Sequence, residues 1–340
     1  MNIFLIGMGN MGLKHLDSLM KLKNKYSLNF IGYFDPSIKN IKYKNKIFYS
    51  EKKINAKTIE EKKIDLCIIS TPHNLTIKYF KIINKTNRNI NLFIEKPFGL
   101  NLSEAKYMMK NKKRSQKIFL GLNYRYYSGI KKLHDDFINS DWGKINSINL
   151  SMAHGHSPAI KKSWKIKKSM AGGGVIIDPG IHIINLLKFF IKEKIEIRKV
   201  ITIKNYFWKT GIEEVALIIL KTKKIPIINV NLSIVKWRSE FKIEINGEKK
   251  YAALSGRGSH YGPQVYRQGQ RWGWLKSKNK NQFKTEKILS KSDEKNSFID
   301  EFESIIKVIK KKHVKINPCQ SAEAFETMSL IEKIYQYAEK

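Results

Sequence analysis

The stretch that decides the fold lies at the amino terminus, where residues 2–6 (NIFLI) run directly into residues 7–12 (GMGNMG). The first segment is a short apolar run of strand-like character. The second is a G-x-G-x-x-G pattern, and apolar residues such as Leu16 and Leu19 follow it at helical spacing. A strand, a glycine turn and a helix in this order are typical of a dinucleotide-binding unit.

Each residue type in this turn has a physical reason. Gly7 permits the tight turn, Gly9 lets the backbone approach a pyrophosphate, and Gly12 lets the helix pack closely against the strand. The amino terminus of the helix would face the anion, which adds Asn10 and Met11 to the expected cofactor contacts.

A second strand is predicted over Asn29–Phe34, and it ends in Asp35, 23 residues after Gly12. A carboxylate at this position can accept a hydrogen bond from the ribose 2′-hydroxyl of NAD and would repel the 2′-phosphate of NADP. Asp35 is also compatible with a turn before Pro36, and Lys39 could accommodate NADP. We therefore predict NAD, with NADP as the less favoured alternative.

The alternation of strands and helices continues along the chain. Strands are predicted over 65–70 and 91–94, and a helix is predicted over 76–83. This order indicates a parallel sheet, whose ligand lies outside the carboxyl ends of the strands. The further residues expected at that edge are Thr71, Pro72, His73, Glu95 and Lys96.

The composition sets limits on function. The 340 residues are 42% hydrophobic and 28% charged, which is ordinary for a globular chain, and they carry a net charge of +36. The basic residues are 57 lysines and only 8 arginines, spread along the chain, so we read a solvated basic surface and predict no nucleic-acid partner. No apolar run approaches the ~20 residues of a membrane span.

The two cysteines, Cys67 and Cys319, lack metal-ligand spacing. We therefore predict no metal site and no disulfide, and we expect a reducing, cytoplasmic location without a signal peptide.

Four later motifs occur in a fixed order. They are EKP at 95–97, GLNYRY at 121–126, GGGVIIDPGIH at 172–182 and NPCQSAE at 317–323. Together with the glycine turn, they resemble the Gfo/Idh/MocA family of nicotinamide-dependent sugar and cyclitol oxidoreductases. The resemblance runs almost from end to end of the chain.

The resemblance implies an α/β protein with an N-terminal Rossmann domain over 1–120. A C-terminal α/β domain over 121–340 would follow, built on a large, mainly antiparallel open sheet. Residues 121–126 would open that domain as a strand, and the exposed face of its sheet would form a homodimer or homotetramer. The terminal helix over 322–337 either stays in this domain or packs back on the first. β-rich segments occur at 145–152, 199–207, 214–220, 227–233 and 240–245.

The resemblance also implies a reaction and its residues. Hydride transfer between nicotinamide and a ring hydroxyl of a sugar, nucleotide sugar or cyclitol requires a base for the hydroxyl proton. His182 is the expected general base, and Lys96 is expected to donate a hydrogen bond to the reacting oxygen. Asp178 would bind substrate or orient His182, if both lie on one helix at i, i+4 spacing. Asn123 and Arg125 are candidate substrate contacts.

Two questions stay open at this stage. A non-catalytic, dinucleotide-sensing regulator with the same fold is the alternative to an enzyme, although a sensor has no need of the three proton-handling residues.

The segment from Arg238 to Trp274 holds four of the eight arginines. It is compatible with recognition of a carboxylate or a pyrophosphate, and equally with an oligomer interface.

Overall fold

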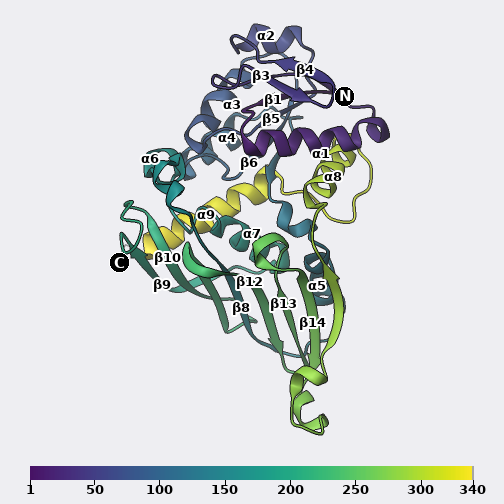
Figure 1. Cartoon of the computed structure of the whole chain (residues 1–340), viewed down its shortest axis with the longest axis vertical. Helices are drawn as coiled ribbons and strands as arrows, with labels where there is room; N and C mark the ends of the chain where they lie inside the picture. The colour runs from purple at the N-terminus through teal and green to yellow at the C-terminus, as the bar shows by residue number, and fades with distance from the viewer. Residues whose placement is uncertain (339–340) are drawn as a thin grey trace. The chain divides into compact units, whose positions relative to one another are not determined.

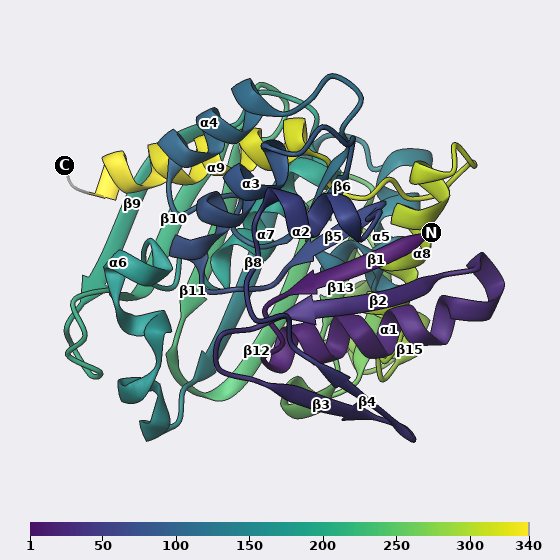
Figure 2. The ribbon, with the colours of Figure 1, turned by 90° about the horizontal axis from the view of Figure 1, so that it is seen from above.

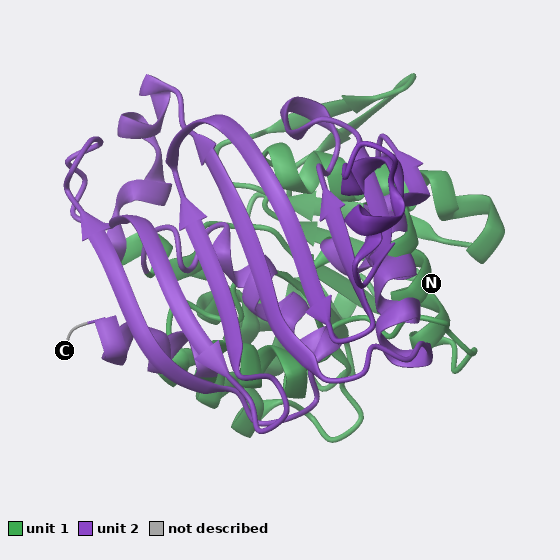
Figure 3. Cartoon of the chain, turned by 90° about the horizontal axis from the view of Figure 1, so that it is seen from below, with its two compact units in different colours: residues 1–123, 169–172, 298–329 green, residues 124–168, 173–297, 330–340 purple. Residues whose placement is uncertain are grey.

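The structure is a computed structural model that describes residues 1–338, and the chain divides into two compact units. Unit 1 contains residues 1–123, 169–172 and 298–329, and unit 2 contains 124–168, 173–297 and the stretch that starts at Leu330 (Figure 3). The chain thus enters unit 2 at Tyr124 and returns to unit 1 for two further segments. Each unit is described by itself below.

Unit 1 is built on a five-stranded parallel sheet with the order β2-β1-β5-β6-β7 (Figure 1). Its strands are β1 (Asn2–Ile6), β2 (Asn29–Phe34), β5 (Leu66–Ile69), β6 (Asn91–Glu95) and β7 (Ile118–Gly121). The central strands are almost continuously apolar because helices cover both faces of the sheet. Since all five strands run in the same direction, their carboxyl ends lie along one edge.

The helices of unit 1 are α1 (Asn10–Tyr26), α2 (Ala56–Glu61), α3 (Thr76–Asn84), α4 (Leu102–Asn111), α8 (Ser297–Ile309) and the first half of α9 (Ser321–Ala338). The core on one face joins α1 to α8 through Leu19 and Phe302. Figure 2 shows α3 and α4 on the other face. The Asn101 side chain caps α4 by accepting a hydrogen bond from the Glu104 amide at 3.0 Å. A small hairpin, β3 (Asn40–Tyr43) and β4 (Lys46–Tyr49), flanks the sheet.

Unit 2 is built on an eight-stranded sheet with the order β15-β14-β13-β12-β8-β11-β10-β9. The strands are β8 (Ile145–Gly155), β9 (Glu196–Lys204), β10 (Glu213–Lys221), β11 (Ile227–Ser233), β12 (Val235–Gly247), β13 (Lys250–Ser255), β14 (Gln264–Gln270) and β15 (Lys287–Ser292). Neighbouring strands are antiparallel except β8 and β11. The helices α5 (Ser128–Asn139) and α7 (Gly180–Phe190) pack on one face, and Figure 3 shows most of the other face uncovered. The helix α6 (Lys168–Ala171) is a single turn, and all of it after Lys168 belongs to unit 1.

The expected fold class is confirmed, and the local predictions differ in places. The strand at Asn29–Phe34 has the expected bounds, and the strand predicted over 199–207 lies three residues earlier, as β9. The prediction that residues 121–126 open the second domain as a strand is wrong. Strand β7 ends at Gly121 and pairs with β6 in the first sheet, and Asn123–Tyr126 form a 3₁₀ turn.

Candidate active site

The glycine turn between β1 and α1 has the geometry that its sequence predicts. Gly7 has a φ of +90°, and a Cβ atom there would lie 2.6 Å from the carbonyl oxygen of Ser70. A Cβ atom at Gly12 would lie 2.2 Å from the carbonyl oxygen of Gly7. At Gly9, by contrast, a Cβ atom would meet nothing within 4 Å. Two glycines are therefore required by the fold itself, and the third faces open space.

Gly9 is the N-cap residue of α1, and it has no side chain that could cap the first amides of the helix. The amino terminus that starts with Asn10 and Met11 therefore presents its partial positive charge toward the open space at Gly9. A dinucleotide pyrophosphate fits this arrangement.

Asp35 follows β2 and holds the glycine turn. Its Oδ2 accepts a hydrogen bond from the Met8 amide at 2.7 Å, and its Oδ1 accepts from the amides of Ser37 and Ile38 at 2.8 and 3.0 Å. The carboxylate thus lies beside the turn, as expected of a residue that contacts ribose, and it also stabilises the turn at Pro36. Both interpretations of Asp35 from the sequence agree with these contacts.

Polar atoms also collect at the carboxyl end of β5. The Oγ1 atom of Thr71 and the Oδ1 atom of Asn74 are buried and have no hydrogen-bond partner among the described residues. Buried polar atoms without partners are uncommon, and a bound ligand is one explanation. His73 lies in the adjacent 3₁₀ turn, and its Nδ1 atom is 2.8 Å from the carbonyl oxygen of Ala171.

Glu95 and Lys96 occupy the carboxyl end of β6, at the same edge as the glycine turn. The Oε1 atom of Glu95 lies 2.7 Å from Nε2 of His15, a fully buried residue of α1. Burial alone would raise the pKa of Glu95, but the hydrogen bond and charge of His15, together with the charge of Lys96, lower it below its usual range. The sequence analysis missed His15, which stands three residues after Gly12.

The glycine run before Asp178 is packed against protein atoms. A Cβ atom at Gly173 would lie 2.0 Å from the Tyr335 hydroxyl, and one at Gly174 would lie 2.2 Å from the carbonyl oxygen of Glu213. The buried Glu213 carboxylate accepts hydrogen bonds from the Gly174 amide at 2.8 Å and from the Tyr335 hydroxyl at 2.6 Å. This part of the run is therefore set by internal packing, and Glu213 was not anticipated.

Asp178 and His182 do not share a helix, contrary to the i, i+4 prediction. Helix α7 begins at Gly180, and Asp178 precedes it in a turn closed by its own amide, which donates to the Gly174 carbonyl at 2.8 Å. The Asp178–Pro179 peptide bond is cis, as is Lys96–Pro97. Because proline restricts the backbone before it, the DPG sequence explains why the helix starts late.

The His182 imidazole is held by an aromatic ring. His182 is 9% exposed, and its ring stacks on Tyr124 with 4.0 Å between centroids and 7° between planes. Tyr124 is itself buried and stacks on Tyr127 at 5.0 Å. The structure thus identifies Tyr124 as the residue that fixes the plane of the imidazole, a role the sequence did not reveal.

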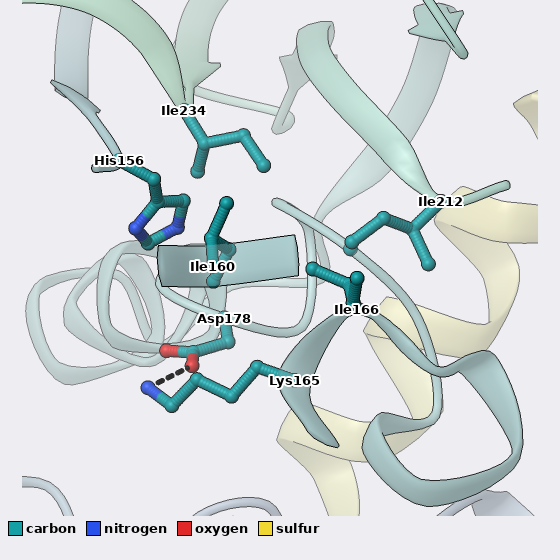
Figure 4. Close-up of a pocket in the computed structure, with 8 residues that line it drawn as sticks. His156, Ile160, Lys165, Ile166, Asp178, Ile212 and Ile234 are labelled. Carbon is teal, nitrogen blue, oxygen red and sulfur yellow. Dashed lines mark hydrogen bonds and ion pairs between the residues drawn. The ribbon is translucent and has the colours of Figure 1, made fainter. Parts of the chain in front are cut away.

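Asp178 also lines a small pocket of unit 2. Figure 4 shows its carboxylate paired with Lys165, with Nζ to Oδ2 at 2.7 Å, while the His156 ring lies nearby. Burial, followed by the charge of Lys165, lowers the pKa of His156. The other lining residues are Ile160, Ile166, Gly174, Ile212 and Ile234.

The two candidate substrate contacts are enclosed by protein. Arg125 is 1% exposed, and its guanidinium donates a hydrogen bond to Oδ1 of Asn185 at 2.6 Å and lies 5.0 Å from the Phe189 ring centroid. Asn123 is 5% exposed. These contacts favour a structural role for Arg125.

None of the helices described over residues 1–338 is long and apolar enough to cross a membrane. Within the same residues, no group of three or more His, Cys, Asp or Glu side chains is arranged to hold a metal ion.

Comparison with curated proteins places these features in context. The chain is 24% identical over 197 residues to myo-inositol 2-dehydrogenase of Thermotoga maritima, which covers 58% of this chain and 56% of that protein. It is 25% identical over 259 residues to glucose-6-phosphate 3-dehydrogenase of Bacillus subtilis, with 73% and 72% covered. The chain thus spans little more than half the length of the first of these relatives and about three quarters of the second.

The WlbA dehydrogenase of Bordetella pertussis, solved in complex with NADH and UDP-GlcNAcA, has the same fold. Its TM-score is 0.76 at 13% identity, over 100% of this chain and 97% of that one. The sequence model of the oxidoreductase family with an NAD-binding Rossmann fold matches residues 1–124, and the Gfo/Idh/MocA C-terminal domain model matches residues 132–253. These two matches cover most of the chain, which therefore belongs to the Gfo/Idh/MocA family of oxidoreductases.

Proposed function

We propose that this protein is an NAD(P)-dependent dehydrogenase or reductase. It transfers a hydride between nicotinamide and a ring hydroxyl or ketone of a sugar, nucleotide sugar or cyclitol, in carbohydrate or surface-polysaccharide metabolism. The observation that carries the proposal is the glycine turn, open at Gly9, at the same sheet edge as Lys96. The relatives that act on inositol and on glucose 6-phosphate support it.

When bound, the nicotinamide cofactor accepts or supplies the hydride. His182 accepts the proton of the substrate hydroxyl as general base, and returns it in the reverse direction. Stacking on Tyr124 holds the imidazole in one plane before substrate binds. The imidazole therefore loses little conformational entropy when it reaches the transition state.

Lys96 donates a hydrogen bond to the reacting oxygen and stabilises the developing alkoxide charge. Asp178 binds a substrate hydroxyl, and its ion pair with Lys165 fixes the position of its carboxylate. We assign catalytic roles to Lys96, Asp178 and His182 on this basis. The proposed cofactor contacts are Gly7, Gly9, Asn10, Met11, Gly12, Asp35, Thr71, Pro72, His73, Glu95 and Lys96.

NAD is the proposed cofactor because of the charge beside the glycine turn. Asp35 places a carboxylate within 2.7 Å of the Met8 amide, where a ribose phosphate would be repelled. Lys39, which could have favoured NADP, donates from Nζ to the carbonyl oxygen of Pro36 at 2.8 Å.

We also propose a cytoplasmic homodimer or homotetramer that uses the uncovered sheet face of unit 2. Apolar side chains on its strands are exposed there, with 44% for Ile201, 37% for Leu217 and 46% for Ile227. Apolar groups in such numbers on one face favour association with a second copy.

The test is turnover by wild type and His182→Ala with inositols, free sugars, sugar acids and nucleotide sugars, followed by the absorbance of reduced nicotinamide. We expect wild type to turn over at least one of these substrates. His182→Ala should lower kcat about 100-fold or more, since general acid–base catalysis contributes ~10²–10⁴ in rate. Affinity for NADH should stay within about threefold, because His182 acts on the substrate.

His313→Ala, at an exposed position of unit 1, is the matched control and should behave as wild type. Loss of NADH binding in His182→Ala would contradict the assigned role. NADH binding by wild type without turnover of any substrate would favour the regulator instead.

A further inference from the structure

Arg257 is carried by a rigid turn after β13. The glycines on both sides, Gly256 and Gly258, have φ values of +75° and +84°, a region that other residues rarely adopt. A Cβ atom at Gly256 would lie 2.1 Å from the carbonyl oxygen of Pro263. The turn therefore requires its glycines, and it holds Arg257 in a defined position.

The guanidinium of Arg257 is surrounded by aromatic rings. Its Cζ atom lies 4.0 Å from the centroid of Tyr261 and 5.3 Å from that of Tyr124. Both tyrosines are buried, with exposed fractions of 8% and 6%. The Tyr261 hydroxyl is in turn 2.9 Å from Nδ1 of His154. Arg257 thus forms one wall of an aromatic and imidazole cluster.

This cation lacks an anionic partner. No carboxylate among the described residues forms an ion pair with Arg257, and its buried Nε atom has no hydrogen-bond partner. The carboxylate that influences the same cluster, Asp178, is paired with Lys165 at 2.7 Å. Aromatic faces recover only part of the hydration that a half-buried guanidinium loses.

The charge of Arg257 acts on two imidazoles beside it. Burial, followed by the charges of His156 and Arg257, lowers the pKa of His154 to about 4. Burial and the charge of Arg257 also lower the pKa of His260. With the imidazoles uncharged near neutral pH, an anion placed here would meet the charge of Arg257.

The other arginines of the segment 238–274 either lie near a carboxylate or are exposed to solvent. Arg267 lies 3.8 Å from Oε2 of Glu286, while Arg271 is exposed and stacks on Trp272 at 4.3 Å. Arg238 is exposed. In a chain that uses lysine almost everywhere, Arg257 is the arginine of this segment that is half-buried, with a buried Nε atom, and has no carboxylate partner among the described residues.

Arg257 is also close to His182. The two side chains contact the same ring, since the His182 imidazole stacks on Tyr124 at 4.0 Å. The Tyr124 ring thus contacts both the proposed base, His182, and the Arg257 guanidinium. Because both groups lie against one ring, we expect them to contact the same sugar.

We propose that Arg257 binds an anionic oxygen group, a carboxylate or a phosphoryl group, carried by the sugar that is the substrate. The substrate class is then anionic sugars rather than neutral sugars or cyclitols. This inference rests on the proposed function, and it makes Arg257 the residue that determines specificity. The guanidinium fork matches either group through paired hydrogen bonds.

The experiment measures binding by titration calorimetry to the NADH-loaded protein. The probes are glucose, glucuronate, glucose 1-phosphate and glucose 6-phosphate, with the galacto and manno counterparts. We expect at least one anionic sugar to bind wild type about tenfold or more tightly than its neutral parent. The carboxylate and phosphate arms show which group is recognised.

Arg257→Gln should reduce this preference to about twofold or less and leave the affinity for the neutral sugar unchanged. Arg257→Lys keeps the charge without the fork and should retain part of the preference. Arg271→Gln is the matched control on an exposed arginine and should match wild type.

The inference is overturned if wild type binds anionic and neutral sugars alike, or binds no anionic probe. It is also overturned if Arg257→Gln weakens neutral and anionic sugars equally, since that pattern indicates a structural role. The wild-type comparison stands even if Arg257→Gln fails to fold. Arg257-dependent binding without turnover would contradict the proposed function alone, whereas turnover of neutral cyclitols without anion preference would end only this inference.

Discussion

Among single residues, His15 shows how the glycine turn and the strand that carries Lys96 are coupled. The imidazole is fully buried, lies 2.7 Å from Glu95, and meets the rings of Phe93 and Phe302 edge-on at 5.0 and 5.3 Å. One side chain of α1 thereby fixes the residue that precedes Lys96. We infer that His15 positions the loop through Glu95.

Replacing His15 by Phe leaves the Glu95 carboxylate without its hydrogen bond in a mostly buried position. Leaving a buried carboxylate without its partner costs about 3 kcal/mol, so we expect a loss of that size in the unfolding free energy at neutral pH. Because the folded-state pKa of Glu95 is below 4.5, the contribution is present above that pH and is lost as pH falls. Urea unfolding measures it.

The double variant His15→Phe, Glu95→Leu is the control, because it removes both polar groups. It should recover part of the loss. Equal stability of His15→Phe and wild type would show that the pair contributes nothing.

The role of a residue could be predicted from the sequence only where the residue belongs to a recognised motif. Lys96, Asp178 and His182 came from the family resemblance, and their roles stay predictions. Tyr124 and Glu213 were not found, because a stacked ring or a buried carboxylate reaches its partner through the fold and leaves no local pattern. Arg257 had a weak signal, as an arginine in a lysine-rich chain.

Among elements, the β1–turn–α1 segment separates two kinds of glycine. Gly12 is required for packing, since an added Cβ would overlap the Gly7 carbonyl oxygen, whereas Gly9 has an ordinary φ of −66° and open space. We expect Gly12→Ala to lower the unfolding free energy by about 1–3 kcal/mol. Gly9→Ala should leave stability unchanged and weaken NADH binding about tenfold or more, because its methyl group enters the pyrophosphate space.

Urea unfolding and NADH fluorescence titration measure the two effects on the same pair of variants. Normal NADH affinity in Gly9→Ala would show that the cofactor does not approach the backbone at this turn. Loss of stability in Gly9→Ala would show that the space is not open.

Elements that depend on local pattern were predicted well, and those that depend on tertiary pairing were not. The apolar strands of the first sheet can be predicted from the sequence, because both of their faces are buried and their residues are almost all apolar. Strands β13 to β15 were missed, since polar residues interrupt their apolar pattern: Gln268 is half-buried and donates a hydrogen bond to Asp136 of α5, and Lys291 is exposed. Their pairing in register fixes them instead.

At the scale of the whole molecule, the charge of +36 arises because 65 basic residues face only 29 acidic ones. The acidic side chains serve as counter-charges: Glu303 pairs with Lys25 and Lys307 at 2.9 and 3.0 Å, and Asp136 pairs with Lys250 at 2.8 Å. Burial alone would raise the pKa of Glu303, but hydrogen bonds from Tyr26, Lys25 and Lys307 lower it to about 2. Mild acid therefore leaves these carboxylates charged, and the histidines decide stability there.

Four histidines with lowered pKa values all belong to unit 2: His134, His154, His156 and His260. Burial is the first cause in each case, and it disfavours the charged imidazolium. The folded-state pKa of His154 is about 4, below its ordinary 6.5. In this window the unfolded state binds more protons, so stability is complete above pH about 6.5 and is lost as pH falls toward 4.

The free energy of unfolding of unit 2 should therefore fall between about pH 7 and about pH 5. The tryptophans of the chain provide an intrinsic probe of this unfolding. All six tryptophans lie in unit 2, so tryptophan fluorescence reports the unfolding of this unit. We expect the urea midpoint to fall by roughly half a molar between these pH values. The double variant His154→Gln, His156→Gln should show a shallower fall, because two of the titrating groups are gone. A midpoint that stays constant or rises in acid would mean that these imidazoles are hydrated in solution and that burial does not lower their pKa values.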